Sequence, residues 1–166
     1  QINAYAVATG EKIWWVRGLT WQLKPTPVMD EDTIYVLGWA GAADLGQQRK
    51  VPSFEEALKL HDGDGDGKLS PEEAPDPKMA KSWDSYDLDR DGFMAERDWY
   101  HYRAKRASGN AVSAIRLGGR GDMTEGAFKW RYYKTLPNVP SPLLYQGVLY
   151  LLKDGGIFTA LDAETG

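Results

Sequence analysis

The sequence predicts a mainly β protein that contains two copies of one strand unit and carries an α-helical insertion. Outside residues 47–106, short apolar runs are bounded by Gly, Pro and Asp, which is typical of strands. Within residues 47–106, apolar residues recur at helical spacing beside two acid-rich loops. We therefore expect two domains, one formed by residues 1–46 with 107–166 and the other by residues 47–106.

An internal repeat supports the strand assignment. The segment TPVMDEDTIYVL (26–37) aligns without gaps with SPLLYQGVLYLL (141–152). The last residues, ALDAETG (160–166), match AYAVATG (4–10) near the start. The chain therefore begins and ends at the same phase of one repeat.

The insertion begins with a predicted helix that leads into the first acidic loop. Ser53 and Glu56 have the spacing of a capping box. Phe54, Ala57 and Leu58 then lie on one helical face.

The first acidic loop, HDGDGDGKLSPEE (61–73), has the ligand spacing of a calcium site. Ca²⁺ takes six to eight oxygen ligands at about 2.3–2.6 Å, and a twelve-residue loop supplies them from positions 1, 3, 5, 7, 9 and 12. Counted from Asp62, these positions hold Asp62, Asp64, Asp66, Lys68, Ser70 and Glu73. Lys68 would contribute its backbone carbonyl and Ser70 a bridging water, while Gly67 at position 6 permits the sharp turn.

A short connection joins this loop to a second predicted helix. Pro75 and Pro77 end the helix that leaves the first loop. Asp76 is placed to cap the next helix, with Pro77 in its first turn. The apolar face of that helix is Met79, Trp83 and Tyr86.

The second loop, DLDRDGFMAERD (87–98), repeats the same spacing. Its expected ligands are Asp87, Asp89, Asp91, the carbonyl of Phe93 and Asp98. Asp98 is one methylene shorter than the usual Glu, and Ala95 at position 9 has no side-chain oxygen. We therefore expect a weaker calcium site that also accepts Mg²⁺. A helix from Ala95 to about Arg106 follows.

Both loops resemble EF-hands, and the resemblance implies a pair of calcium-binding hands. The expected ligands are all oxygens, so Zn²⁺, which favours Cys and His, is not expected. The cofactor predicted from these residues is Ca²⁺ at two sites.

A second resemblance covers most of the remaining chain. AYAVATGEKIW (4–14) fits the pattern A-x-D-x-x-T-G-x-x-x-W, with Ala6 in place of the Asp. AIRLGGRGDMTEGAFKW (114–130) looks like a longer version of it. These segments resemble the PQQ-like repeats of bacterial quinoprotein-type β-propellers, in which the Trp docks one blade on its neighbour.

The resemblance implies a partial β-propeller of two blade repeats with the EF-hand pair inserted into the first. The insertion is expected between a strand that ends near Gly38 and a strand at 111–117. A propeller needs about four to eight blades. We therefore expect either a piece of a longer propeller or a chain that associates with copies of itself.

The function predicted from these features is a non-catalytic binding or scaffold module in which Ca²⁺ stabilises the insertion. One alternative is part of a PQQ-dependent quinoprotein dehydrogenase, although we recognise no constellation that would hold PQQ and do not expect this cofactor. Another is a calcium sensor whose hands open to grip a target, with Met79 and Met94 supplying apolar surface. No catalytic grouping is recognised, so an enzyme is the less favoured class.

Composition and charge limit the classes of partner that we expect. The formal charge is −4, and we interpret the basic cluster Arg103, Lys105 and Arg106 as a solvated helix face, not a nucleic-acid site. No apolar run approaches the roughly 20 residues of a membrane span. Without cysteine, disulfides and thiol catalysis are excluded. The propeller resemblance implies a periplasmic or secreted protein, and the expected partner is an unidentified protein or an envelope component.

Overall fold

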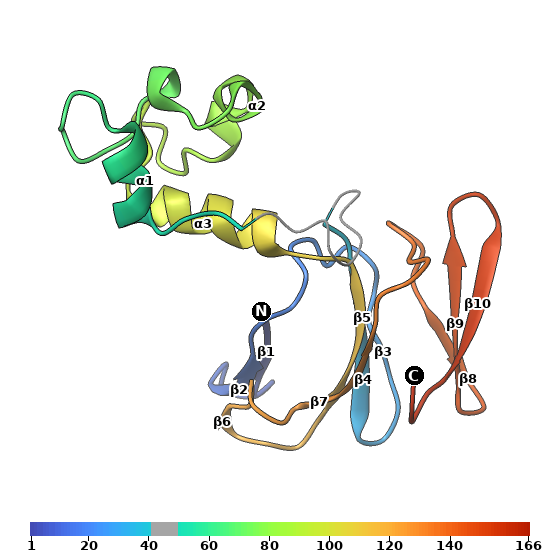
Figure 1. Ribbon diagram of the computed structural model, residues 1–166. Coiled ribbons are helices and arrows are strands. Elements are labelled where there is room, and N and C mark those ends of the chain that lie inside the picture. The colour runs from blue at the N-terminus through green and yellow to red at the C-terminus, as the bar shows by residue number, and fades with distance from the viewer. Residues whose placement is uncertain (41–49) are drawn as a thin grey trace. The chain divides into compact units, whose positions relative to one another are not determined.

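The computed structural model describes residues 1–40 and 50–166, which fall into two compact units (Figure 1). The β unit is Gln1–Gln48 with Ser108–Gly166, and the helical unit is Arg49–Ala107. The domain boundary predicted between residues 46 and 47 lies outside the described residues. The mainly β class with a smaller helical part is confirmed.

The β unit contains three sheets, none of which closes into a barrel within the described residues. Their strand orders are β1-β2-β6, β3-β4-β5-β7 and β10-β9-β8. The strands are β1 Ile2–Tyr5, β2 Lys12–Val16, β3 Val28–Met29, β4 Thr33–Gly38, β5 Ala111–Arg116, β6 Gly121–Asp122, β7 Phe128–Tyr132, β8 Leu143–Tyr145, β9 Val148–Lys153 and β10 Ile157–Asp162. All pairings are antiparallel except that of β2 with β6.

The insertion lies in the connection between β4 and β5. These strands pair along their whole length, from Thr33 opposite Arg116 to Gly38 opposite Ala111. The chain therefore leaves and rejoins the β unit at directly paired residues of one sheet, so the insertion interrupts no strand.

Along each strand of the central sheet, β3-β4-β5-β7, successive side chains point to opposite faces. Apolar residues of other strands cover both of these faces. Val36 and Ile115 pack with Trp14 and Val16 of β2. The opposite face packs against the β8–β10 sheet in a core of Tyr35, Leu37, Val112, Ala114, Leu136, Leu149, Leu151, Leu161 and Ala163.

Turns of one sequence pattern recur in the β unit. In the turn 162–166 the backbone N–H of Gly166 donates to the carbonyl of Asp162 at 2.8 Å. Gly10 donates in the same way to Ala6, also at 2.8 Å. The Asp162 carboxylate additionally accepts hydrogen bonds from two backbone N–H groups and a hydroxyl of its own turn, which Ala6 cannot do.

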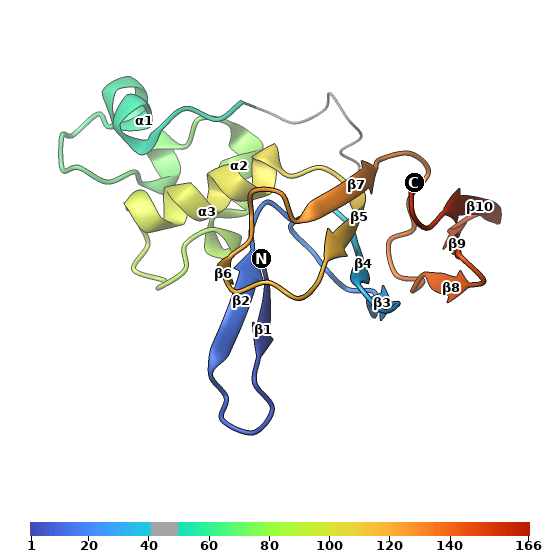
Figure 2. The same ribbon diagram turned by 90° about the horizontal axis from the view of Figure 1, so that it is seen from below.

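Two of these turns dock on the preceding sheet. The indole N–H of Trp130 in β7 donates to the carbonyl of Ala163 at 3.0 Å. In the turn 122–126, Met123 donates its backbone N–H to Trp15 at 2.9 Å. Val7 holds the equivalent position in the turn 6–10, and its side chain is fully exposed. This turn is the free end of the β1–β2 hairpin (Figure 2).

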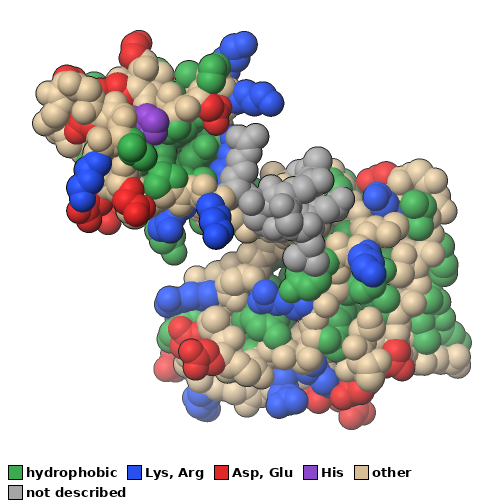
Figure 3. All heavy atoms as spheres, in the orientation of Figure 1, with side chains coloured by type: hydrophobic (Ala, Val, Ile, Leu, Met, Phe, Trp, Pro, Cys, Tyr) green, Lys and Arg blue, Asp and Glu red, His purple; other side chains and the backbone are tan. Residues whose placement is uncertain are grey.

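The outer face of the β8–β10 sheet is apolar and exposed. Its side chains point away from the core, and hydrophobic atoms reach the surface over these strands (Figure 3). Tyr150 and Phe158 stack on this face with ring centroids 5.5 Å apart. Its exposed members are Leu143, Tyr145, Leu152 and Phe158.

The helical unit contains α1 Phe54–His61, η1 Pro71–Glu73, α2 Pro77–Lys81, η2 Trp83–Ser85 and α3 Glu96–Ala107. The predicted capping box is present, with Glu56 N–H donating to the Ser53 hydroxyl at 3.2 Å and Ser53 N–H to the Glu56 carboxylate at 2.8 Å. The core is Ala57, Leu69, Met79, Trp83, Tyr86, Met94, Trp99 and Tyr102.

The second predicted helix is not continuous. It ends at Lys81, and a separate 3₁₀ turn, η2, begins at Trp83. The carbonyl of Ser82 accepts hydrogen bonds from the N–H of Ser85 at 3.0 Å and from its hydroxyl at 2.6 Å, which tightens the chain at this point. Met79, Trp83 and Tyr86 are nevertheless all buried.

Candidate metal centre

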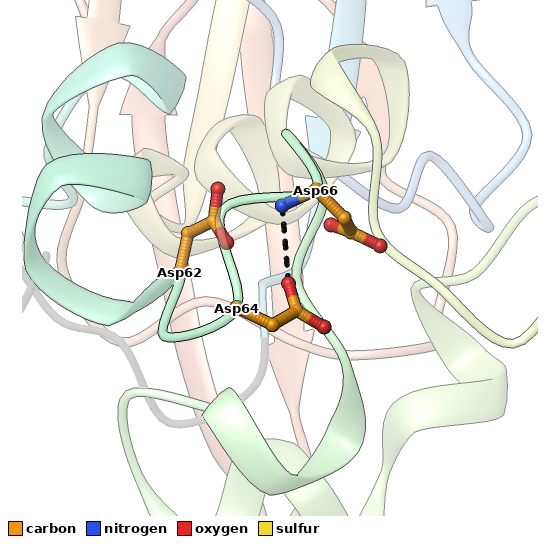
Figure 4. Close-up of side chains that lie close together, drawn as sticks. All are labelled: Asp62, Asp64 and Asp66. Carbon is orange, nitrogen blue, oxygen red and sulfur yellow. Dashed lines mark hydrogen bonds between the residues drawn. The ribbon is translucent and has the colours of Figure 1, made fainter.

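Three carboxylates of the first loop converge. One oxygen each from Asp62, Asp64 and Asp66 lies within 4.8 Å of the others (Figure 4). All three come from the segment between α1 and η1, and Asp66 also donates its backbone N–H to the Asp64 carboxylate at 3.1 Å. A cation would find several oxygens at this point.

The second loop forms a matching group. One oxygen each from Asp87, Asp89 and Asp91 again lies within 4.8 Å of the others. Asp87 is buried, whereas Asp89 and Asp91 are exposed.

The hydrogen bonds of the two loops correspond position by position. In the first loop the pairs are Gly65 N–Asp62 Oδ1 (2.7 Å), Gly67 N–Asp62 Oδ2 (3.1 Å), Asp66 N–Asp64 Oδ1 (3.1 Å) and Lys68 N–Asp66 Oδ1 (2.8 Å). In the second they are Arg90 N–Asp87 Oδ1 (2.6 Å), Gly92 N–Asp87 Oδ2 (2.9 Å), Asp91 N–Asp89 Oδ1 (3.3 Å) and Phe93 N–Asp91 Oδ1 (2.9 Å). The equal spacing seen in the sequence thus corresponds to equal backbone geometry.

The position-12 carboxylates close both loops in the same manner. Glu73 accepts the backbone N–H of Gly63 at 2.7 Å and that of Ser70 at 2.9 Å. Asp98 accepts the N–H of Leu88 at 3.1 Å and that of Ala95 at 3.0 Å. The shorter side chain therefore reaches the same two backbone positions, and it is buried there.

These contacts favour the ionised form of Glu73. The backbone N–H of Ser70, then that of Gly63, and the Ser70 hydroxyl lower the pKa of Glu73 below its usual value. The carboxylate is therefore charged at neutral pH and available to a cation. The Ser70 hydroxyl lies 2.9 Å from Glu73 Oε2, so it supports the ligand at position 12.

Left-handed backbone at position 6 produces the sharp turn in each loop. Gly67 has φ +80° and Gly92 has φ +91°, a region that costs other residues steric strain. Position 4 is also left-handed, with Gly65 in the first loop and Arg90 at φ +60° in the second. The glycines that the spacing predicts for the turn are therefore required by the observed conformation.

The two loops are joined at position 8. Leu69 and Met94 form an antiparallel bridge, and both side chains are fully buried. The indole N–H of Trp83 donates to the carbonyl of Gly92 at 3.0 Å, which fixes the second loop on the same core. The apolar residue at position 8 is thus the attachment of each loop to the helical unit.

An ion pair between the loops was not predicted from the sequence. Lys68 Nζ lies 2.8 Å from Asp91 Oδ2 and 5.1 Å from the centroid of the Phe93 ring. The ion pair lowers the pKa of Asp91 and raises that of Lys68. The positive charge at position 7 of the first loop was the available signal, but the partner is 23 residues away.

The structure thus brings together three of the four carboxylates predicted as ligands in each loop, whereas Glu73 and Asp98 accept backbone hydrogen bonds at the ends of their loops. Lys68 and Phe93 occupy position 7 of the two loops, and Ser70 occupies position 9 of the first. The chemistry of the donor set, carboxylates and carbonyls without thiolate, fits a hard cation.

Comparison with protein-family models, with curated proteins and with solved structures yields no match. Across the described residues, no helix has the length and apolar character needed to cross a membrane.

Proposed function

We propose that this chain is a calcium-binding module in which two Ca²⁺ ions stabilise the helical unit. The first ion would be held by Asp62, Asp64, Asp66, the carbonyl of Lys68, a water on Ser70, and Glu73. The second would be held by Asp87, Asp89, Asp91, the carbonyl of Phe93, and Asp98.

The observation that carries this proposal is the hydrogen-bond correspondence between the two loops. An acidic surface turn has no physical reason to repeat the same six hydrogen bonds in a second turn. A cation site, by contrast, requires several oxygens to surround one point. Both loops place oxygens in this way, and both match the EF-hand pattern in sequence.

Electrostatics supports the same conclusion. Carboxylates held within a few ångströms of one another repel, and a divalent cation removes this repulsion. Binding free energy is then available to the folded helical unit, because the unfolded chain does not hold the carboxylates together. Mg²⁺ is the expected competitor in the second loop, since Asp98 offers fewer oxygens than a bidentate Glu.

A stabilising role is favoured over a sensing role. Met79 and Met94, the residues expected to line a target groove, are fully buried in the core of the helical unit. The helix that leaves the first loop is only the three-residue turn η1. The first loop is therefore not followed by a helix that could swing outward on calcium binding.

For the β unit we propose a partial β-propeller with PQQ-like repeats that serves in non-catalytic binding or scaffolding. The support comes from the repeated turns and from their docking on the preceding sheet, through the indole of Trp130 and through the backbone carbonyl of Trp15. Val7 and the outer β8–β10 face are apolar and exposed, as they would be where further blades belong. The chain would accordingly form part of a longer propeller or self-associate, in the periplasm or outside the cell, with an envelope protein as partner.

Isothermal titration calorimetry of the metal-free chain with CaCl₂ tests the calcium proposal. We expect two Ca²⁺ per chain. The double variant Asp62→Asn with Asp87→Asn, which alters position 1 of both loops, is expected to lose most of the binding heat. A stoichiometry below two, or tetrahedral nitrogen ligation in a metal-bound structure, contradicts the proposal.

A further inference from the structure

Lys68 connects the two candidate sites. Its backbone carbonyl is at position 7 of the first loop, whereas its ammonium group lies 2.8 Å from Asp91 Oδ2 at position 5 of the second. Its Nζ also lies over the Phe93 ring, at position 7 of the second loop. The backbone of Lys68 is thus part of the first loop, whereas its ammonium group contacts the second.

The loops differ in this respect. Within residues 1–40 and 50–166, no Lys or Arg forms an ion pair with Asp62, Asp64, Asp66 or Glu73. The second loop, by contrast, has one of its four carboxylates paired with a cation supplied by the protein itself.

We infer that Lys68 is a built-in counter-ion that lowers the divalent-cation affinity of the second loop and holds this loop in shape without metal. This inference rests on the proposed calcium function. The ammonium group of Lys68 already neutralises part of the negative charge of the second loop that a metal ion would otherwise neutralise. If Lys68 stays in place, it repels the ion, and if it leaves, its ion pair with Asp91 is lost.

The bridge between Leu69 and Met94 fixes this arrangement. Leu69 follows Lys68 directly, and Met94 follows Phe93, so the hydrogen-bonded bridge keeps the Lys68 stem beside the second loop. The ion pair is therefore positioned by buried backbone. The two side chains are 42% and 41% exposed, so the pair itself lies at the surface and its contribution to stability is small.

The test is a CaCl₂ titration of the full chain followed by NMR at the Gly67 and Gly92 amides, one in each loop. For Lys68→Met, which keeps the apolar stem and the backbone carbonyl, we expect the affinity reported by Gly92 to rise relative to that reported by Gly67. The expected change is on the order of threefold to tenfold, as Coulomb's law gives for one unit charge several ångströms from a divalent ion at a water-exposed site. Lys68→Arg should keep the wild-type ratio.

Lys59→Met is the matched control. Lys59 also forms a 2.8 Å ion pair, with Glu55, but on α1 and outside both loops. The Lys59→Met substitution removes the same charge and should leave the ratio of the two calcium affinities unchanged. A second readout is thermal unfolding in EDTA, where Lys68→Met should lower the melting temperature of the helical signal more than Lys59→Met does.

The outcomes separate this inference from the calcium proposal. If both amides saturate with Ca²⁺ but Lys68→Met leaves the ratio unchanged, or lowers the relative affinity at Gly92, the role of Lys68 is overturned and calcium binding stands. If neither amide of the unaltered chain responds, the calcium proposal fails and this inference fails with it.

Discussion

Leu69 and Met94 exchange both of their backbone hydrogen bonds, Leu69 N–H to Met94 O at 3.0 Å and Met94 N–H to Leu69 O at 2.8 Å. Each residue is at position 8 of its loop, and each side chain is fully buried. The two loops therefore share one hydrogen-bonded bridge and one apolar core. Neither loop can be displaced without disturbing the other.

The first prediction concerns this shared core. Met94→Ala removes a fully buried side chain and leaves a cavity, so we expect the helical unit to lose about 2–4 kcal/mol of unfolding free energy. Urea unfolding monitored by circular dichroism at 222 nm measures it. Leu60→Ala is the control, because Leu60 is exposed on α1 and should change stability by less than about 0.5 kcal/mol. Equal effects of the two variants would contradict the assignment of the core.

The second prediction concerns metal removal. Without a divalent cation the clustered carboxylates of both loops repel, and the short helices of the unit have little core to offset this repulsion. Adding a chelator to the calcium-loaded chain is expected to decrease the helical circular dichroism and to leave the strand signal largely unchanged. Spectra that do not change on chelation would count against the coupling of metal binding to helix formation.

The third prediction is that the second loop is the weaker calcium site. Asp98 is one methylene shorter than Glu73, and Ala95 has no oxygen to orient a bridging water, whereas Ser70 has. Asp98→Glu should raise the calcium affinity of the second loop, and Glu73→Gln should cost the first loop most of its affinity. Titration followed at the Gly67 and Gly92 amides resolves the two sites.

The burial of Asp98 calls for a control in the Asp98→Glu experiment. Asp98 is only 3% exposed, so an added methylene must be accommodated within the core. Unfolding of Asp98→Glu in EDTA therefore serves as its control, since packing strain would appear there without metal. Saturation of Gly92 before Gly67 in the unaltered chain would reverse the predicted order.

The candidate site could be predicted from the sequence to the extent that it is local. The ligands of each loop lie within twelve consecutive residues, so their spacing alone indicates the geometry. The contact of Lys68 with Asp91 depends instead on how two segments pack, and no spacing rule reports it. The break at Ser82 was missed for a related reason, because the apolar stripe from Met79 to Tyr86 fits a continuous helix equally well.

The β unit shows the same division between local and tertiary information. The turns that contain Val7 and Ala163 have matching sequences, yet Val7 is fully exposed and Ala163 is buried. The difference arises from Trp130, which covers Ala163 from the preceding sheet. The parallel pairing of β6 with β2 was likewise not predicted, since β6 is only the two residues Gly121–Asp122.

The fourth prediction is that Ala6→Asp stabilises the β unit. At the equivalent position, Asp162 accepts hydrogen bonds from the N–H groups of Glu164 and Thr165 and from the Thr165 hydroxyl. The backbone of the turn 6–10 already has the matching Gly10 N–H to Ala6 O bond, so a carboxylate should find the same donors. Differential scanning calorimetry is expected to show a higher melting temperature.

The pH dependence distinguishes a carboxylate effect from a packing effect. The backbone N–H and hydroxyl of Thr165, together with the N–H of Glu164, hold the pKa of Asp162 below its usual value. A carboxyl with a lowered folded-state pKa adds stability above its unfolded pKa and loses this contribution as the pH falls through the folded value. The gain from Ala6→Asp should therefore decline as the pH falls below the ordinary pKa of an aspartate, and it should vanish below the lowered folded-state pKa. Ala6→Asn, which has nearly the same shape but no charge, should show a smaller gain without this acid dependence.

The fifth prediction concerns the exposed face of the β8–β10 sheet. Phe158 is 64% exposed, stacks on Tyr150 and lies opposite the exposed Leu152 of β9. An apolar sheet face of this kind favours association in water. We therefore expect the isolated chain to self-associate as its concentration rises, in a manner that sedimentation velocity detects over a dilution series. Phe158→Glu places a charge on this face, and burying that charge without a partner is costly, so the dissociation constant should rise about tenfold or more. Tyr100→Glu is the matched control, because Tyr100 is similarly exposed, at 72%, but lies on α3 in the helical unit. A monomer that persists at every concentration, or equal effects of the two variants, would show that this face does not drive association.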